Sequence, residues 1–261
     1  MPKILKVRID KCSLEKAVEL SCKTKQQIHI CTVNPEIILE AQKNTKFLKI
    51  LNRSALNTAD GIGVLWASKF IKTSQGKSKP VTIAKWMFSL LSILIWPSYI
   101  KTEISNRVTG VELTKEICKT TKKRIFLLGG SEKVVSKTKT SLNANIVGTS
   151  SNSGDKNMDK ENIKLINDSK AEILFVAFGA PKQELWINRN LRNLKTVHTA
   201  IGVGGTFDFI SGEITRAPEW MQRTGTEWIY RLLKQPKRIK RIFNATIKFP
   251  LTVLGYSLKN R

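Results

Sequence analysis

Short apolar runs alternate along the chain with segments whose apolar residues recur every three to four positions. The short runs are typical of buried strands, and the periodic segments are typical of helices that bury one face. Strands are predicted over residues 3–9, 27–33, 55–59, 124–128, 172–178 and 197–203. Helices are predicted over residues 14–20, 108–122, 161–166 and 181–190, and from residues 35, 63 and 131 onwards. Because strands such as ILFVAFG are continuously apolar, the pattern predicts an α/β fold, with a largely parallel sheet covered by helices on both faces.

Two of these helices have clear start signals. Ser13 precedes the first periodic segment, where its hydroxyl can accept a backbone N–H as an N-cap. Asn34 and Pro35 combine an N-cap residue with the imino acid that suits the first helical position.

Residues 81–100 fall outside the alternation. Their apolar part, Trp86 to Trp96, has 11 residues if its two serines are allowed, whereas a helix that spans a bilayer needs roughly 20. Tryptophans at both ends favour a helix that lies in the membrane interface. A buried core helix is the alternative.

The tail from residue 211 is the second exception. It carries 11 Lys or Arg residues and three acidic ones. Its apolar residues Ile239, Ile242, Phe243 and Ile247 fall on one helical face among basic residues. We therefore predict a core over residues 1–210, with an apolar insertion at about 71–106, and a basic helical appendage over residues 211–261.

The net charge of +25 indicates an anionic partner, although a general excess of lysine would also produce it. A basic amphipathic tail suits an anionic membrane surface. Nucleic acid is the rival partner, but the chain has no paired zinc ligands, aromatic-rich strand of the RNA-binding type or basic region followed by heptads. We expect a membrane partner and no nucleic acid.

The cysteines and histidines do not suggest a zinc site. The four cysteines have no CxxC spacing, and the two histidines lie far apart in the sequence. This pattern predicts reduced thiols in a cytoplasmic protein. Residues 1–10 contain no apolar stretch of the kind found in signal peptides.

Candidate chemistry gathers where strands end. Glycine-rich turns at 127–134 and 202–208 can present backbone N–H groups to a phosphate, or can simply pack a helix closely on a strand. Neither turn fits GxGxxG with a downstream acidic residue, so an NAD-type enzyme is disfavoured. No Walker lysine, DxD metal motif or Ser/His/Asp set is present.

Polar residues remain at the carboxyl ends of the strands, where a doubly wound sheet binds its ligand. They are Thr32, Asn34, Asp60, Arg107, Thr109 and Gln183. Each has a structural alternative: Asp60 could cap the following helix, Asn34 is also a suitable N-cap, and Gln183 could lie on a helix surface. Physical reasoning alone thus indicates an enzyme for a phosphorylated ligand that works without a metal.

Several stretches resemble the WecG/TagA/CpsF glycosyltransferase family. They cover most of the chain in the family's order: TVNPEIILEAQ, ADGIGVLWASK, RVTGVEL, FLLGGSE, FVAFGAPKQELWI, GVGGTFDFISGEITRAPEW and TEWIYRLLKQPKR. The resemblance implies a Rossmann-like core with a C-terminal appendage. It also implies transfer of a sugar from a UDP donor to N-acetylglucosamine on a polyprenyl diphosphate, at the inner face of the membrane, during synthesis of a surface polysaccharide or teichoic acid.

The resemblance further implies inversion of the anomeric centre and no metal or other cofactor. N-acetylmannosamine or its uronic acid is the typical sugar, and UDP-glucose or another hexose donor is the alternative. A homo-oligomer is one way to bury the apolar surface that a core without its appendage would expose.

The resemblance implies a role for each residue that matches one of the family's motifs. Asp60 is expected to be the general base for the acceptor hydroxyl, and Thr32 and Asn34 to line the donor pocket. Arg107 is expected at the diphosphate and Gln183 near the sugar or nucleotide. In all, we expect Asp60 and Thr32 to be catalytic and seven residues to bind substrate: Asn34, Arg107, Thr109, Gln183, Arg231, Arg238 and Arg241. Arg231 and Arg238 are seven positions apart and are expected to share a helical face of the appendage.

The chain departs from the family between residues 70 and 106, where typical members have a short link. We hypothesise that the Trp86–Trp96 segment makes a second membrane contact beside the site.

Overall fold

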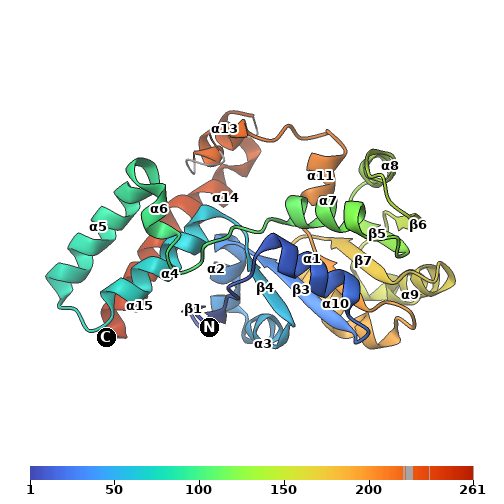
Figure 1. The fold of residues 1–261 in the computed structure, drawn as a ribbon, viewed down its shortest axis with the longest axis horizontal. Helices are drawn as coiled ribbons and strands as arrows, with labels where there is room; N and C mark the ends of the chain where they lie inside the picture. The colour runs from blue at the N-terminus through green and yellow to red at the C-terminus, as the bar shows by residue number, and fades with distance from the viewer. Residues whose placement is uncertain (220, 222–225, 235, 261) are drawn as a thin grey trace.

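A six-stranded sheet runs through the molecule in the computed structural model, which describes all residues except 220, 222–225, 235 and 261 (Figure 1). Its strand order is β4-β3-β8-β7-β5-β6, and every neighbouring pair is parallel. The strands are β3 (Ile28–Val33), β4 (Leu56–Ala59), β5 (Ile125–Gly129), β6 (Ile146–Ser150), β7 (Ile173–Ala177) and β8 (Thr199–Gly202). The predicted α/β class with a parallel sheet is confirmed.

Helices cover both faces of this sheet, as predicted. One face packs against α1 (Leu14–Lys23), α7 (Gly110–Thr120), α8 (Glu132–Ser141) and α11 (Thr206–Ile210). The other face packs against α9 (Asp159–Asp168) and α10 (Lys182–Asn190), and a further cluster contains α2 (Pro35–Lys43) and α3 (Thr45–Arg53). Alternation along a strand separates the two sides: Ile125 and Leu127 join one cluster, and Phe126 and Leu128 join the other.

Two local predictions are wrong. Residues 3–9 form two short antiparallel strands, β1 (Lys3–Ile4) and β2 (Val7–Arg8), because Leu5 and Lys6 have left-handed backbone conformations that reverse the chain. The strand β6 is missing from the prediction. It is an edge strand and all its residues are only half-buried, so its sequence lacks a continuous apolar run.

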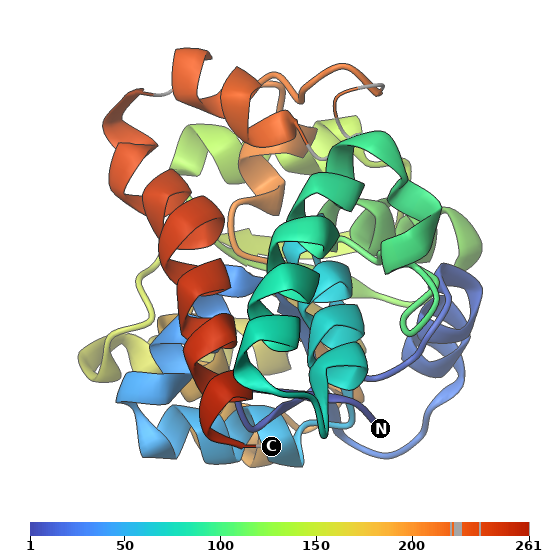
Figure 2. The same ribbon diagram turned by 90° about the vertical axis from the view of Figure 1, so that its left-hand side faces the viewer.

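Residues 79–100 form α5 (Lys79–Ile95) and α6 (Pro97–Ile100) at one end of the molecule (Figure 1). Figure 2 shows α5 running beside α4 (Ile62–Ser74) and α15 (Phe249–Lys259). Its inner residues, including Trp86, pack against the core, while its outer residues are exposed. The core alternative therefore describes the inner face of this helix, and the interfacial location of its outer face stays a prediction. In the part of the chain that the structure describes, no helix is long and apolar enough to cross a membrane.

The C-terminal segment is helical but not continuous. It contains α13 (Glu227–Lys234), the 3-10 turn η3 (Pro236–Arg238), α14 (Ile239–Phe243), the π-helical turn η4 (Asn244–Lys248) and α15. Arg231 lies in α13 and Arg238 in η3, and the prediction that they share a helical face depends on the side chain of Arg231, which lies outside the described residues. Phe249 and Val253 of α15 are fully buried in the cluster that includes α4.

Candidate functional site

Asp60 lies at the carboxyl end of β4, beside the end of β3. Its backbone N–H donates to the carbonyl oxygen of Val33 at 2.8 Å. Gly61 follows with a φ of +110°, a conformation that disfavours a side chain, and occupies the N-cap position of α4. Asp60 therefore lies one residue before the N-cap position of this helix. The Asp-Gly turn places a carboxylate at the edge where the ligand cleft of a doubly wound sheet forms.

The segment 107–110 crosses the same edge. The Val108 N–H donates to the Ala59 carbonyl at 3.0 Å, and the Thr58 hydroxyl donates to the Val108 carbonyl at 3.0 Å. The α-carbon of Gly110 lies so close to the β8 loop that an added Cβ would stand 2.7 Å from Thr206 Oγ1. These contacts bring Arg107 and Thr109 to the strand edge that carries Asp60.

Glu112 forms ion pairs with two arginines at this edge of the sheet. Thr109 caps α7 in a capping box with Glu112, which pairs with Arg107 at 3.6 Å and with Arg216 at 3.2 Å. Burial raises the pKa of Glu112, but the Thr109 hydrogen bond and the two guanidinium charges outweigh burial and lower this pKa below its ordinary value. Sequence reasoning did not single out Arg216, although it lies in the family-like stretch GVGGTFDFISGEITRAPEW, because its partner Glu112 is 104 positions away in the sequence.

Thr32 and Asn34 use their side chains within the fold. The buried Thr32 hydroxyl donates to the Gly202 carbonyl at 2.9 Å and ties β3 to β8. Asn34 Oδ1 accepts the Ile37 N–H at 3.0 Å, which confirms its predicted N-cap geometry. Both residues lie beside Asp60 at the strand ends, and their expected contacts with a donor sugar stay predictions.

Gln183 connects two loops at the same edge. Its Oε1 accepts the N–H groups of Gly179 at 3.1 Å and Gly204 at 2.9 Å, and its Nε2 donates to Glu184 Oε1 at 2.7 Å. The residue is only 1% exposed, so the alternative of an ordinary helix-surface residue is wrong. Gln183 thus holds the loops after β7 and β8 together at this edge of the sheet.

Two appendage arginines lie near the strand ends. Arg241 forms an ion pair with Glu36 of α2, with Nη2 2.7 Å from Oε2. Arg238 lies close enough to Asp208 of α11 for its charge to lower the pKa of that carboxyl, which burial raises more strongly. The appendage therefore passes over α2 and α11, whose strands β3 and β8 are neighbours. The side chain of Arg231 lies outside the described residues.

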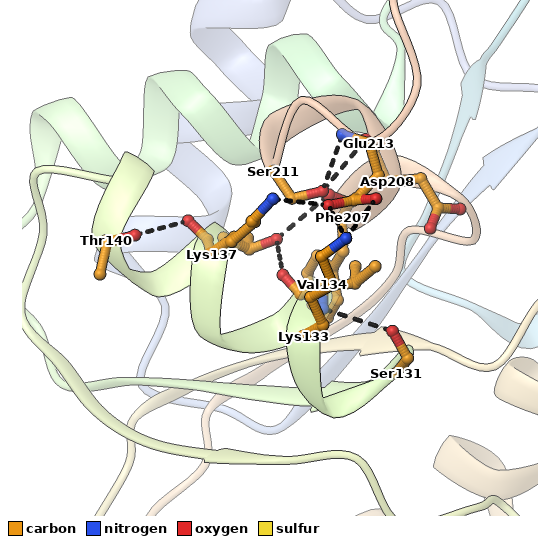
Figure 3. A network of polar contacts seen from close by, with 10 residues as sticks. Ser131, Lys133, Val134, Lys137, Thr140, Phe207, Asp208, Ser211 and Glu213 are labelled. Carbon is orange, nitrogen blue, oxygen red and sulfur yellow. Dashed lines mark hydrogen bonds and ion pairs between the residues drawn. The ribbon is translucent and has the colours of Figure 1, made fainter.

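A second polar network fastens the segment that leads into the appendage (Figure 3). Lys133 and Lys137 of α8 contact Glu213 at 3.1 Å and 2.7 Å. Ser131, at the glycine-rich turn after β5, caps α8. In Figure 3 this network lies beside Asp208, so α8 supports the part of α11 that Arg238 approaches.

The described residues contain no group of three or more His, Cys, Asp or Glu side chains placed to hold a metal ion. The strand ends instead carry Asp60 and four arginines, Arg107, Arg216, Arg238 and Arg241. The acidic neighbours of these arginines are Glu112, Asp208 and Glu36. A parallel α/β sheet with such an edge defines a class of protein that binds anionic ligands at the carboxyl ends of its strands.

Comparison with known proteins gives the family. The sequence model described as "Glycosyl transferase WecG/TagA/CpsF family" matches residues 2–95 and 91–261. A relative from Bacillus subtilis (strain 168) is 32% identical over 234 residues, which are 86% of this chain and 78% of the relative. That relative is named N-acetylglucosaminyldiphosphoundecaprenol N-acetyl-beta-D-mannosaminyltransferase. The chain belongs to the WecG/TagA/CpsF family and is a glycosyltransferase. The two matched segments overlap within α5.

Proposed function

We propose that the protein transfers N-acetylmannosamine, or its uronic acid, from a UDP donor to N-acetylglucosamine carried on a polyprenyl diphosphate. One observation carries this proposal: the relative from Bacillus subtilis has this acceptor and this sugar in its name and matches 86% of the chain. The cluster of arginines supports it, because both substrates carry diphosphates and guanidinium groups bind them through paired hydrogen bonds.

In the proposed reaction, Asp60 accepts the proton of the acceptor hydroxyl while that oxygen attacks the anomeric carbon of the donor. The bond from the anomeric carbon to UDP breaks on the opposite face, so the configuration inverts. Arg107 and the appendage arginines neutralise the charge that develops on the departing UDP, which replaces the need for a metal. Thr32, Asn34, Thr109 and Gln183 shape the pocket from below.

We further propose that the protein works attached to the inner face of the membrane. The described part of the segment from residue 226 onwards contains α13, α14 and α15, with basic residues beside exposed apolar ones such as Ile239 and Phe243. A basic amphipathic surface of this kind binds anionic lipid. The active site would then lie at the membrane surface, where the lipid-linked acceptor diffuses.

The test is to incubate the protein with UDP-N-acetylmannosamine and a lipid-diphosphate N-acetylglucosamine acceptor, and to look for a disaccharide-lipid. Asp60→Asn should lose at least a hundredfold in turnover and keep its fold by circular dichroism. Asp168→Asn is the matched control, since Asp168 lies exposed on α9 and is paired only across its own helix turn. Full activity of Asp60→Asn would remove the assignment of the base.

Three additions complete the test. The anomeric configuration of the product, read by NMR, checks inversion. Assays with and without EDTA check metal independence. A donor panel that includes UDP-N-acetylmannosaminuronic acid and UDP-glucose checks the sugar, and turnover of UDP-glucose alone would favour the alternative hexosyl transfer.

A further inference from the structure

Exposed apolar side chains are concentrated in two segments of the chain. Of the eighteen large hydrophobic side chains that are exposed among the described residues, eight lie within residues 81–96 and seven within residues 228–251. Scattered single residues of this kind are normal on a soluble surface, whereas a concentration marks an interaction site. The group on residues 81–96 belongs to the insertion helix α5 and the residue after it.

The polarity of α5 is reversed relative to an ordinary surface helix. Its inner face carries small hydroxyl residues, and Ser89 accepts the Trp66 Nε1–H at 2.9 Å. The Trp86 Nε1–H donates to the Pro250 carbonyl at 3.1 Å, which fastens α5 to α15. These buried hydrogen bonds fix the rotation of the helix about its axis, so the opposite face cannot turn inward.

The outer face of α5 is a continuous apolar stripe. Met87 is 62% exposed and Ile95 is 68% exposed. The stripe follows the helical repeat, with exposed residues at positions 83, 87, 91, 94 and 95. A surface helix in contact only with water would carry polar residues at these positions.

The basic residues near this apolar stripe favour an anionic lipid surface as its partner. Residues 61–102 contain six lysines and no acidic residue, and residues 228–261 contain no acidic residue either. Glu103, the next acidic residue after α5, is paired with Lys72 and Lys11. An apolar face bordered by cations alone is complementary to the interfacial layer of an anionic bilayer.

The stripe is also continuous with the appendage. Figure 2 shows α5 and α15 side by side at one end of the molecule, and Ile247 of η4 and Leu251 of α15 are exposed as well. In both views α6, which follows α5, lies toward the end occupied by α13 (Figures 1 and 2). The carboxyl end of α5 is thus the end nearer to the appendage segments that reach the strand edges.

We propose that the outer face of α5 is a second docking surface for an anionic lipid bilayer, in addition to the basic appendage. The helix lies in the interface with its outer side chains among the acyl chains, and Trp96 at the headgroup level. With two contacts, on α5 and on the appendage, the molecule is held in one orientation on the membrane. The inference rests on the proposed function only for the identity of the lipid-linked acceptor.

The experiment measures binding to vesicles without any substrate. Vesicles of phosphatidylglycerol and phosphatidylcholine in equal parts are compared with pure phosphatidylcholine by co-flotation. The test variant is the double change Leu91→Asp and Ile95→Asp. The matched control is Leu20→Asp and Leu165→Asp, which alters two exposed leucines on α1 and α9. We expect the test variant to lose at least tenfold in affinity for anionic vesicles, and the control to lose less than twofold.

A second measurement separates α5 from the appendage. Quenching of tryptophan fluorescence by brominated lipids should fall in Trp96→Phe, because Trp96 is exposed at the end of α5. Trp228→Phe in α13 reports on the appendage in the same way. Loss of quenching in Trp228→Phe alone would overturn the proposal and leave docking to the appendage.

Three further results would contradict the proposal or reassign this face. Unchanged vesicle binding by the test variant, or no binding by the wild type, would overturn the proposal. A wild-type dimer in solution that the test variant dissociates, without any effect on vesicle binding, would assign the face to a second copy instead. Turnover on a water-soluble acceptor analogue is expected to stay unchanged in the test variant, so failure of the membrane contact is distinguished from failure of the proposed reaction.

Discussion

Arg241 holds both carboxylate oxygens of Glu36, 205 positions away in the chain, with Nε 3.0 Å from Oε1 and Nη2 2.7 Å from Oε2. The pair joins α14 to the first turn of α2, directly after the N-cap Asn34. A guanidinium in this geometry presents the same paired donors that a diphosphate requires. Glu36 thus keeps an appendage arginine beside the proposed donor pocket.

The Arg241–Glu36 pair leads to a prediction about turnover. Both side chains are partly exposed, so breaking the pair should change the free energy of unfolding by less than about 1 kcal/mol. Arg241→Ala should lower kcat/KM for the lipid acceptor at least tenfold, because a diphosphate loses its guanidinium. Glu36→Gln should keep most of the turnover, and Lys240→Ala removes a neighbouring charge as the control. Equal losses in Arg241→Ala and Glu36→Gln would mean that Arg241 only anchors the appendage.

Removing the Gln183 side chain should destabilise the protein. Gln183→Ala leaves the N–H groups of Gly179 and Gly204 without the side-chain oxygen that now accepts them. We expect a loss of about 2–4 kcal/mol in the free energy of unfolding, measured by urea denaturation. Gln75→Ala, at an exposed position, should change it by less than about 0.5 kcal/mol. Unchanged stability together with lost turnover would show that Gln183 acts by direct contact with substrate.

A pair of glycine substitutions tests the close approach at the strand edge. In Gly110→Ala the new Cβ would lie 2.7 Å from Thr206 Oγ1 and 3.3 Å from the Val203 carbonyl oxygen. Relief of this clash must move the segment that carries Arg107, so we expect a loss of about 1–3 kcal/mol in stability and a fall in turnover.

Gly255→Ala is the matched control, because its Cβ would meet nothing within 4 Å on helix α15. It should stabilise the protein by about 0.5–1 kcal/mol. Melting temperatures and kcat of both variants provide the measurement, and equal effects of the two substitutions would contradict the proposed close approach.

Glu184 should make stability depend on pH. Burial raises its pKa from 4.5 to about 7 in the folded protein, partly opposed by the hydrogen bond from Gln183. Between these values the folded state binds more protons than the unfolded state, so stability falls as pH rises from about 4.5 to about 7 and then levels off. The accumulated loss is on the order of 3 kcal/mol.

Glu184→Gln removes this titration, so the difference in unfolding free energy between wild type and variant should vary with pH in that window. Urea denaturation at half-unit steps of pH measures it. Parallel curves for the two proteins would contradict the assignment.

Local patterns determined the regular elements. Ser13, Asn34 and Ser131 each accept a backbone N–H three residues ahead, an interaction complete within one turn of chain. Strands β7 and β8 are buried on both faces. Their uninterrupted apolar runs predict this burial from the sequence. The edge strand β6 and the hairpin at Leu5 and Lys6 have neither a cap residue nor a continuous apolar run, and they were therefore not predicted.

The sequence by itself thus determined the strands and helices, their order and the residues that end the strands. Motif resemblance also pointed to Asp60. Only the tertiary structure decided that β8 inserts between β3 and β7, that Gln183 is buried beneath two loops, that Arg216 shares Glu112 with Arg107, and that α5 turns its apolar face outward. The reason is physical: caps and periodicity arise from neighbours in the chain, whereas these relationships join residues far apart in sequence and exist only once the whole core has packed.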